Sequence, residues 1–194
     1  MLRVLFVCTG NICRSPMAHG FLAQRSARLF DGAIQVRSAG TWARSGSSPV
    51  DDAVRSAAAR GADIAGLRST PFAPSLARWA DLVVAMTAEQ REEILEQAPE
   101  AAQKTFTLKG LVAVLESLPP PVARASRDSI LDRVAAAAEL RASGRAAAPV
   151  DEDVADPLGL PPGVFDDVAS EIADLTDRLL HGLAVTDRSP VREA

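Results

Sequence analysis

A length of 194 residues suits one sizeable core and is short for two ordinary domains joined by a linker. The formal net charge of −4 argues against nucleic acid as the main partner, because proteins that bind a phosphate backbone usually present a basic face. No stretch approaches the roughly 18 uninterrupted apolar residues of a membrane span, and two cysteines make no disulfide scaffold, so we expect a cytoplasmic protein without a membrane span.

The first predicted strand leads into the most informative loop of the chain. Residues 4–7 form a short β-branched and aromatic run, and Pro16 suits the first turn of a helix, where a missing N–H costs nothing. Cys8 is therefore expected at the carboxyl end of a strand. Backbone N–H groups between Thr9 and Ser15 can turn inward towards one anion, and such a nest fits a phosphate group.

The side chains of this loop favour nucleophilic chemistry. The helix N-terminus, the amides and Arg14 create a positive potential that favours the thiolate form of Cys8. The planar guanidinium group of Arg14 can donate hydrogen bonds to two phosphoryl oxygens, and Ser15 can donate a hydrogen bond to the Cys8 sulfur. The alternative is a small core cysteine. The flanking strand and helix, with Gly10 and Asn11 between them, favour the anion site.

Strands alternate with helices along the rest of the chain. Apolar runs predict strands over residues 4–7, 33–37, 81–86 and 104–108, and periodicity predicts helices over 16–30, 51–60, 87–97, 111–118, 129–143 and 164–183. Gly61 is expected to close the second helix, and Thr87 with Gln90 forms a predicted capping box. The pattern predicts an α/β fold, a parallel sheet with helices on both faces and a ligand site at the carboxyl ends of the strands.

The region before the last predicted helix is less regular. Residues 109–150 form a mainly helical insertion that either shapes a lid or partner surface or serves as an alanine-rich spacer. Residues 146–154 are poor in apolar side chains. We expect one domain over residues 1–183 and a disordered tail over residues 184–194.

Four segments resemble the low-molecular-weight protein tyrosine phosphatase family. They are the loop segment at residues 4–16, Ser-Ala-Gly-Thr at 38–41, residues 81–86, and Asp156-Pro157. The match runs through the chain in order, apart from residues 109–150. The resemblance implies a four-stranded parallel sheet in flavodoxin-like order, with no metal and no organic cofactor.

The resemblance also implies a two-step mechanism. Cys8 attacks phosphorus, Arg14 and the loop amides hold the phosphate, and Asp156 protonates the leaving oxygen. Water then hydrolyses the phosphocysteine, with Asp156 as base. The residues that the resemblance assigns to substrate binding are Thr9, Gly10, Asn11, Ile12, Cys13, Ser15 and Trp42, and those that hold the loop and sulfur are Asn11, Ser15 and Ser38.

Asp156 has a chemical argument of its own. An Asp-Pro dipeptide is usually only a turn, and Pro157 stiffens the backbone after the aspartate. Cleavage of a phosphate ester at neutral pH needs a proton on the leaving oxygen, and the Cys8 loop contains no acid. The neighbouring carboxylates are rivals for this role: Asp151, Glu152 and Asp153.

Two further loop residues have alternative interpretations. The resemblance implies that Cys13 forms a reversible disulfide with Cys8 that protects the nucleophile, whereas a packing role beneath the loop is the alternative. Trp42 stands where the family often has an aromatic wall, and a partly buried surface residue is the alternative. His19 and His181 make no metal-ligand set, and we expect both to be structural.

The substrate is less constrained than the chemistry. Many relatives carry tyrosines after the Asp-Pro pair, whereas Leu158-Gly159 follows here, so stacking on a phosphotyrosine ring would come from Trp42, Phe165 or Phe72. Ile12 favours a flat ring, because arginine-phosphate phosphatases of this family tend to have threonine there. The resulting prediction is a phosphotyrosine phosphatase acting on phosphoproteins, by analogy on a bacterial tyrosine kinase.

Three alternatives stay open. A protein-arginine phosphatase would use the same chemistry. An arsenate reductase with a thiol relay would need further cysteines downstream, and the chain has none. A non-catalytic phosphate-binding module would need neither the Cys8 thiolate nor Asp156.

Overall fold

The four strands form one parallel sheet. The computed structural model describes residues 1–29, 34–121, 126–145 and 151–184. The strands are β1 (Leu2–Cys8), β2 (Ile34–Gly40), β3 (Leu82–Ala85) and β4 (Thr105–Thr107). Their order is β2-β1-β3-β4, so β1 pairs with both β2 and β3 and all the neighbouring strands run parallel. The predicted flavodoxin-like sheet is confirmed.

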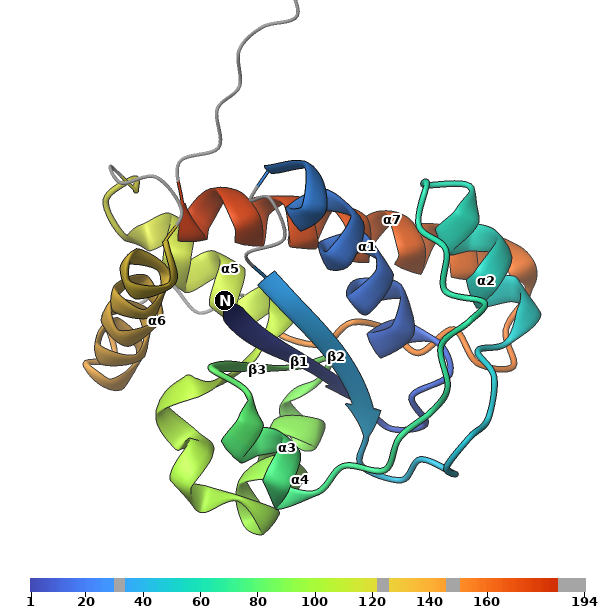
Figure 1. Ribbon diagram of the computed structural model, residues 1–194, viewed down its shortest axis with the longest axis horizontal. Coiled ribbons are helices and arrows are strands. Elements are labelled where there is room, and N and C mark those ends of the chain that lie inside the picture. The colour runs from blue at the N-terminus through green and yellow to red at the C-terminus, as the bar shows by residue number, and fades with distance from the viewer. Residues whose placement is uncertain (30–33, 122–125, 146–150, 185–194) are drawn as a thin grey trace, which may run out of the picture.

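Helices cover both faces of the sheet (Figure 1). One face carries α1 (Arg14–Leu29), α2 (Asp51–Ala58), α5 (Leu108–Ser117) and α7 (Pro162–Leu183). The other carries α3 (Pro74–Trp79), α4 (Ala88–Gln97) and the 3₁₀ turn η1 (Pro99–Lys104). Because both faces are covered, the central strands β1 (after Arg3) and β3 are apolar without alternation, whereas the edge strand β2 alternates buried or half-buried residues with the exposed Gln35 and Arg37.

Alternate residues of β1 belong to two separate cores. Val4, Phe6 and Cys8 pack in the larger core with α1, α5 and α7. Leu5 and Val7 point to the opposite face and pack in the smaller core with α3 and α4. This two-residue period places Cys8 on the α1 face, at the carboxyl end of the central strand.

Several element boundaries differ from the sequence prediction. Helix α1 begins two residues before Pro16, which still lies in the first turn, and α2 ends at Ala58, with Gly61 in the left-handed region at φ +84°. The short α3 and η1 were not predicted, because each is only 6 residues long and has no apolar periodicity. The predicted ends at residues 30 and 33 lie outside the described residues, as does the tail from residue 185.

The insertion packs at the edge of the sheet. Helix α6 (Arg127–Ala142) lies beside α5, and its Arg141 donates to the backbone oxygens of Thr105 (2.7 Å) and Ala102 (2.9 Å) while stacking over the Phe106 ring. Arg141 therefore satisfies the Thr105 carbonyl of the edge strand β4, and free backbone groups on such an edge would otherwise invite pairing with another chain. None of its residues lines the cleft around Cys8.

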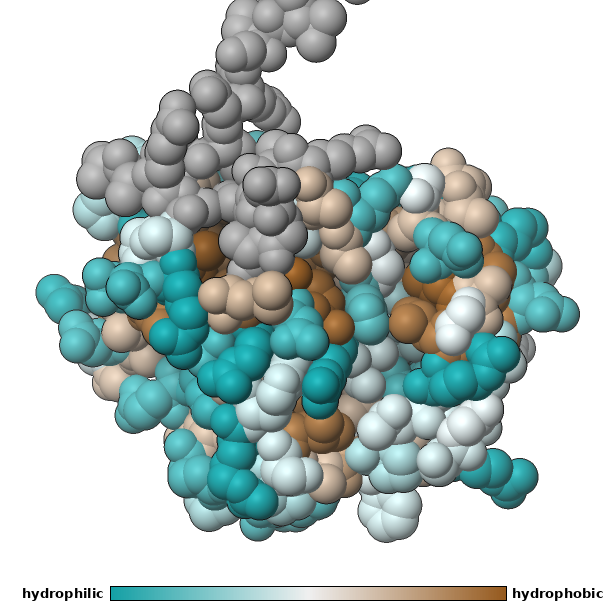
Figure 2. Space-filling view, in the orientation of Figure 1, coloured by the Kyte–Doolittle hydropathy of each residue, from teal (hydrophilic) through white to brown (hydrophobic). Residues whose placement is uncertain are grey.

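The surface shown in Figure 2 is mixed, with hydrophilic side chains separating the apolar patches. Within the described ranges, no helix combines the length and the apolar character needed to cross a membrane.

Asp81 joins three elements at the amino end of β3. Its carboxylate accepts hydrogen bonds from Arg3 Nη2 of β1 and Arg127 Nη2 of α6, both at 2.9 Å, and from Arg3 N at 3.0 Å. Burial by itself would raise the pKa of Asp81, but the hydrogen bonds from the two arginines outweigh it and lower the pKa to about 2. The stabilising form is therefore the ionised carboxylate.

We predict that Asp81→Asn lowers the free energy of unfolding at pH 7 by about 1–3 kcal/mol, because two arginines lose their charged partner. An aspartate with a depressed pKa stabilises the fold above its unfolded value of 3.8 and loses that contribution as the pH falls towards 2. Urea unfolding should show that the difference in the free energy of unfolding between wild type and variant decreases over that pH range. Asp174→Asn, at an exposed helical ion pair with Arg178, is the matched control and should cost roughly 0.5 kcal/mol or less. A gap that stays constant from pH 7 to 2 would contradict the role of the Asp81 charge.

Candidate active site

The predicted loop and the predicted acid share one cleft. It has a volume of about 120 Å³ and is lined by Cys8, Thr9, Gly10, Ile12, Cys13, Arg14, Asp156 and Leu158. Residues 9–13 connect the end of β1 to the start of α1. The fold thus brings Asp156 to Arg14 across 142 residues of sequence.

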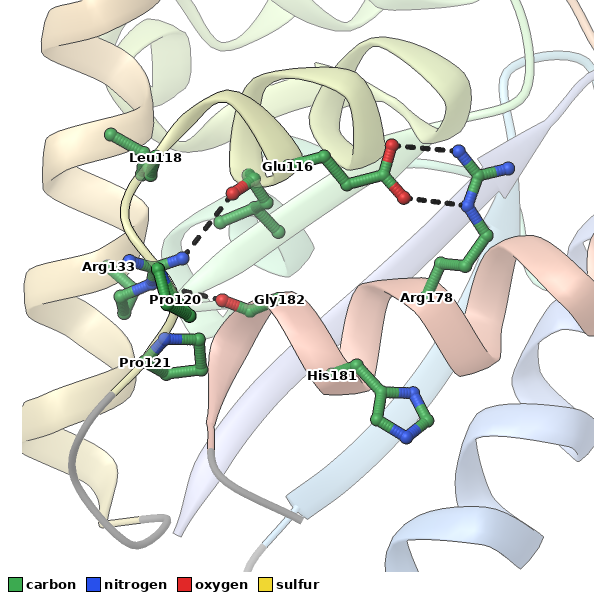
Figure 3. Close-up of a pocket in the computed structure, with 9 residues that line it drawn as sticks. Glu116, Leu118, Pro120, Pro121, Arg133, Arg178, His181 and Gly182 are labelled. Atoms are coloured by element: carbon green, nitrogen blue, oxygen red, sulfur yellow. Dashed lines mark hydrogen bonds and ion pairs between the residues drawn. The ribbon is translucent and has the colours of Figure 1, made fainter.

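A larger groove elsewhere is a weaker candidate. It measures about 410 Å³ and lies among α5, α6 and α7 (Figure 3). Its charged groups are already paired, since Glu116 binds Arg178 (2.8 and 2.9 Å) and Arg133 donates to the backbone oxygens of Leu115, Pro119 and Gly182. Arg133 therefore caps the carboxyl ends of two helices. Among the described lining residues of the groove there is no cysteine, serine or threonine.

The Cys8 sulfur is surrounded by hydrogen-bond donors. Asn11 N donates to Sγ at 3.2 Å, and Ser15 Oγ lies 3.0 Å from Sγ. Ser15 Oγ also accepts from Asn11 Nδ2 (2.9 Å), which leaves its own hydrogen for the sulfur or for the Ala39 carbonyl at 3.3 Å. Such contacts stabilise negative charge on a buried sulfur.

Asn11 gives the loop its shape. Its φ is +52°, and it is the one non-glycine residue with positive φ in the described chain. Asparagine tolerates this left-handed conformation better than most residues. Its side chain holds the turn from both sides, because Oδ1 accepts from Thr70 N (2.9 Å) while Nδ2 reaches Ser15.

Gly40, at the end of β2, lets the loop pass close by. A Cβ atom at this position would overlap the Thr9 carbonyl oxygen and crowd Asn11 N at 2.9 Å. Thr41 N and Trp42 N then donate to the carbonyls of Cys8 (2.9 Å) and Thr9 (3.0 Å). The Ser-Ala-Gly-Thr segment therefore supports the loop through its backbone.

Arg14 is buried and incompletely paired. Its Nη1 donates to the Val154 carbonyl (3.1 Å) and its Nη2 to Asp156 Oδ2 (2.6 Å), while the buried Nε has no partner. A buried N–H without an acceptor is costly and rare in native structures. Arg14 thus offers an unused donor beside the loop amides, as expected of a site built to receive an anion.

Only one of the four candidate carboxylates reaches the cleft. Asp156 is half-exposed, pairs with Arg14 and accepts from Leu158 N (3.1 Å), with Pro157 buried after it. The other three have structural contacts elsewhere: Asp151 with Lys109 and Asp153 N, Glu152 with Thr107, and Asp153 with Ala88 N.

Ser38 and Trp42 lie differently from the sequence expectation. The side-chain partner of Ser38 Oγ is His19 Nδ1 (3.4 Å), so it does not hold the sulfur or Asn11 as predicted. Burial lowers the pKa of His19 to about 4, which leaves a neutral ring at pH 7. Trp42 is 77% exposed, its Nε1 donates to Glu93 Oε1 (2.9 Å), and it does not line the cleft.

Cys13 and the two phenylalanines are buried. Both cysteines are free thiols, and burial together with the nearby Cys8 charge raises the pKa of Cys13 to about 12. Phe72 and Phe165, considered for stacking on a substrate ring, belong to the two cores and do not line the cleft.

Gln90 is a site residue that the sequence analysis missed. The predicted capping box is half correct, because Thr87 Oγ1 accepts from Gln90 N (3.2 Å), but the Gln90 side chain turns away to Thr9 and Met86 N. Its place in a Thr-x-x-Gln pattern concealed this contact. In the described part of the chain, no group of His, Cys, Asp and Glu could hold a metal ion.

The comparisons with known proteins all point to the same family of phosphatases. Residues 3–144 match the family described as low molecular weight phosphotyrosine protein phosphatase. The protein-arginine-phosphatase of Geobacillus stearothermophilus is 34% identical over 181 residues, covering 93% of this chain and 95% of that protein. The low molecular weight protein-tyrosine-phosphatase Etp of Escherichia coli K12 is 32% identical over 126 residues, covering 65% and 80%.

A solved structure is similar over nearly the whole chain. The low molecular weight protein tyrosine phosphatase from T. tengcongensis superposes with a TM-score of 0.70 at 30% identity, covering 93% of this chain and 98% of that one.

Proposed function

Because the chain belongs to the low molecular weight phosphotyrosine protein phosphatase family, we propose that this phosphatase hydrolyses phosphotyrosine in protein substrates through a phosphocysteine intermediate. Cys8 is the proposed nucleophile, Arg14 and the loop amides the phosphate ligands, and Asp156 the acid and base. The observation that carries these roles is one cleft lined by the Cys8 thiol, the Asp156 carboxylate and Arg14, whose Nε has no partner.

In the first step, Cys8 Sγ forms a bond to phosphorus while the bond from phosphorus to the tyrosine oxygen breaks. Asp156 gives its proton to that oxygen, so tyrosine leaves neutral. Arg14 Nε and the amides of residues 9–15 neutralise the charge on the phosphoryl oxygens. The contacts of Asn11 N and Ser15 with the sulfur support the thiolate that this step requires.

In the second step, a water molecule attacks phosphorus through its oxygen, and Asp156 removes a proton from that water. The bond from sulfur to phosphorus breaks, and Cys8 leaves as a thiolate stabilised by Ser15 and Asn11. Products are inorganic phosphate and the regenerated enzyme. Both proposed steps use only water and groups of this chain.

The ion pair between Arg14 and Asp156 fits this cycle. A phosphate in the cleft competes with Asp156 for the guanidinium, since both are anions and Nη2 lies 2.6 Å from Asp156 Oδ2. Substrate binding therefore frees a carboxylate at the mouth of the cleft. Once protonated beside the bound phosphate, that group is ready to serve as the acid.

Ile12 supports tyrosine as the substrate residue. Ile12 and Leu158, which is 52% exposed, both line the cleft, and aliphatic side chains suit the faces of a flat ring. Protein-arginine phosphatase is the second candidate, favoured by the Geobacillus stearothermophilus relative. A phosphoarginine guanidinium would find Asp156 as the single carboxylate among the lining residues.

The proposed substrates are phosphoproteins, and a tyrosine-phosphorylated bacterial kinase is one such partner. The free thiols of Cys8 and Cys13 suit a reducing compartment such as the cytoplasm.

We predict that the reduced enzyme hydrolyses phosphotyrosine peptides faster than phosphoarginine or phosphoserine peptides, because the aliphatic side chains of Ile12 and Leu158 in the cleft suit an aromatic ring. Ile12→Thr should reduce the preference for phosphotyrosine, measured as kcat/KM for phosphotyrosine divided by kcat/KM for phosphoarginine. Cys8→Ser should abolish turnover of all three, since its hydroxyl is a poor nucleophile here. Phosphate release from each peptide measures this. Faster cleavage of phosphoarginine by the wild type would establish the second candidate, and turnover by Cys8→Ser would refute the mechanism.

Asp156→Asn is expected to lower kcat for phosphotyrosine roughly 10²–10⁴-fold, because the leaving oxygen loses its proton donor. The loss should shrink for aryl phosphates whose leaving phenol is more acidic. Asp151→Asn is the matched control, since Asp151 contacts Lys109 and lies outside the cleft, and its kcat should stay near the wild-type value. An equal decrease in kcat in the two variants would contradict the role of Asp156 as the acid.

Mild peroxide is expected to inactivate the wild type reversibly. Peroxide oxidises the Cys8 thiolate to a sulfenic acid, and the Cys13 thiolate then attacks the Cys8 sulfur. The disulfide forms as hydroxide leaves and takes a proton from the solvent to become water. Because the pKa of Cys13 is raised to about 12, disulfide formation should accelerate from pH 7 to 9. Mass spectrometry should find the disulfide in the wild type and the sulfinate in Cys13→Ala. Sulfinate at equal rates in both proteins would rule out protection by Cys13.

A further inference from the structure

Gln90 links the phosphate-binding loop to the end of β3. Gln90 as a whole residue is 3% exposed, although glutamine is usually a surface residue. Gln90 Oε1 accepts from Met86 N at 3.2 Å, and Gln90 Nε2 donates to Thr9 Oγ1 at 3.0 Å. Thr9 follows Cys8 directly and lines the cleft.

The direction of these hydrogen bonds follows from the first donor. Met86 N carries a hydrogen and has no acceptor capacity, and it also donates to the Val7 carbonyl at 3.0 Å. Only the oxygen of the Gln90 amide can face it, so the amide nitrogen must face Thr9. Thr9 Oγ1 is then the acceptor in that contact.

This arrangement leaves the hydroxyl hydrogen of Thr9 free. A threonine hydroxyl has one hydrogen, and within the described residues no acceptor takes it. The Thr9 backbone is held at the same time, because its carbonyl accepts from Trp42 N at 3.0 Å. The free hydrogen therefore belongs to a residue of fixed position at the edge of the cleft.

We propose that Gln90 is a positioning residue that directs the Thr9 hydroxyl as a donor to the phosphoryl group. The chain of donors runs from Met86 N through the Gln90 amide to Thr9 Oγ1 and ends on a phosphoryl oxygen. Each bond polarises the next, which strengthens the last donor. This assignment rests on the proposed phosphatase function and adds a donor to those of Arg14 and the loop amides.

A double-mutant cycle separates this role from simple packing of α4. Thr9→Val removes the hydroxyl with little change in shape and should lower kcat/KM for para-nitrophenyl phosphate about tenfold or more, as expected for a hydrogen bond to a charged group. Gln90→Leu should lower it by roughly three- to tenfold. The double variant should match Thr9→Val alone, because Gln90 acts through Thr9. If the loss in kcat/KM of the double variant equals the product of the two single-variant losses, the proposal is overturned.

The dissociation constant for inorganic phosphate, measured by calorimetry on the same variants, should follow the same pattern. Gln97→Leu is the matched control, because Gln97 lies exposed on the same helix and away from the loop. Its kcat/KM and phosphate affinity should equal those of the wild type. A wild type that binds phosphate but hydrolyses no ester would overturn the proposed function, whereas multiplicative losses in an active enzyme would overturn only the role of Gln90.

Gln90→Glu tests the direction of the donors and keeps the shape if Gln90→Leu does not fold. The introduced carboxylate, when ionised, would accept the Thr9 hydrogen and draw it away from the cleft, whereas the protonated carboxyl would donate to Thr9 as glutamine does. The deficit in kcat/KM relative to wild type should therefore grow as the pH rises through the titration of the new carboxyl. In the Thr9→Val background the pH-dependent deficit should shrink, since only charge repulsion is left. An equal deficit in both backgrounds would contradict the proposal.

Discussion

The left-handed turn at Asn11 is the constraint on which the rest of the site depends. With φ at +52°, the Asn11 amide reaches the Cys8 sulfur, and the side chain is free to bridge Thr70 N and Ser15. The same residue therefore bends the loop, donates to the sulfur and orients the serine beside it. Gly40 makes this turn feasible, because a larger residue would collide with the Thr9 carbonyl.

The strand order explains how distant residues meet at that loop. Because β1 lies between β2 and β3, the carboxyl ends of three strands converge and deliver Cys8, Gly40 and Met86 to one edge. Val154 attaches the acid segment to this edge, since its N–H donates to the Met86 carbonyl (2.8 Å) and its carbonyl accepts from Arg14. Asp156, two residues later, is thus positioned by backbone hydrogen bonds.

The described residues of the insertion contact the sheet edge, and none of them lines the cleft. Helix α6 packs against α5, its Arg141 donates to the Thr105 carbonyl of β4, and Arg127 in its first turn pairs with Asp81, at the opposite end of β3 from Met86. The aliphatic side chains among the lining residues of the cleft are those of Ile12 and Leu158.

The sequence by itself determined the strand, loop and helix around Cys8 and the α/β class, because these features depend on neighbouring residues and on local periodicity. It also identified Asp156 as a candidate, because the Asp-Pro pair resembles the family's motif and ester cleavage needs an acid. The tertiary structure decided which of four carboxylates meets Arg14, that Ser38 pairs with His19, and that Gln90 reaches Thr9. These contacts join residues 19 to 142 positions apart, and they depend on how strands and helices are oriented in space, which no local pattern encodes.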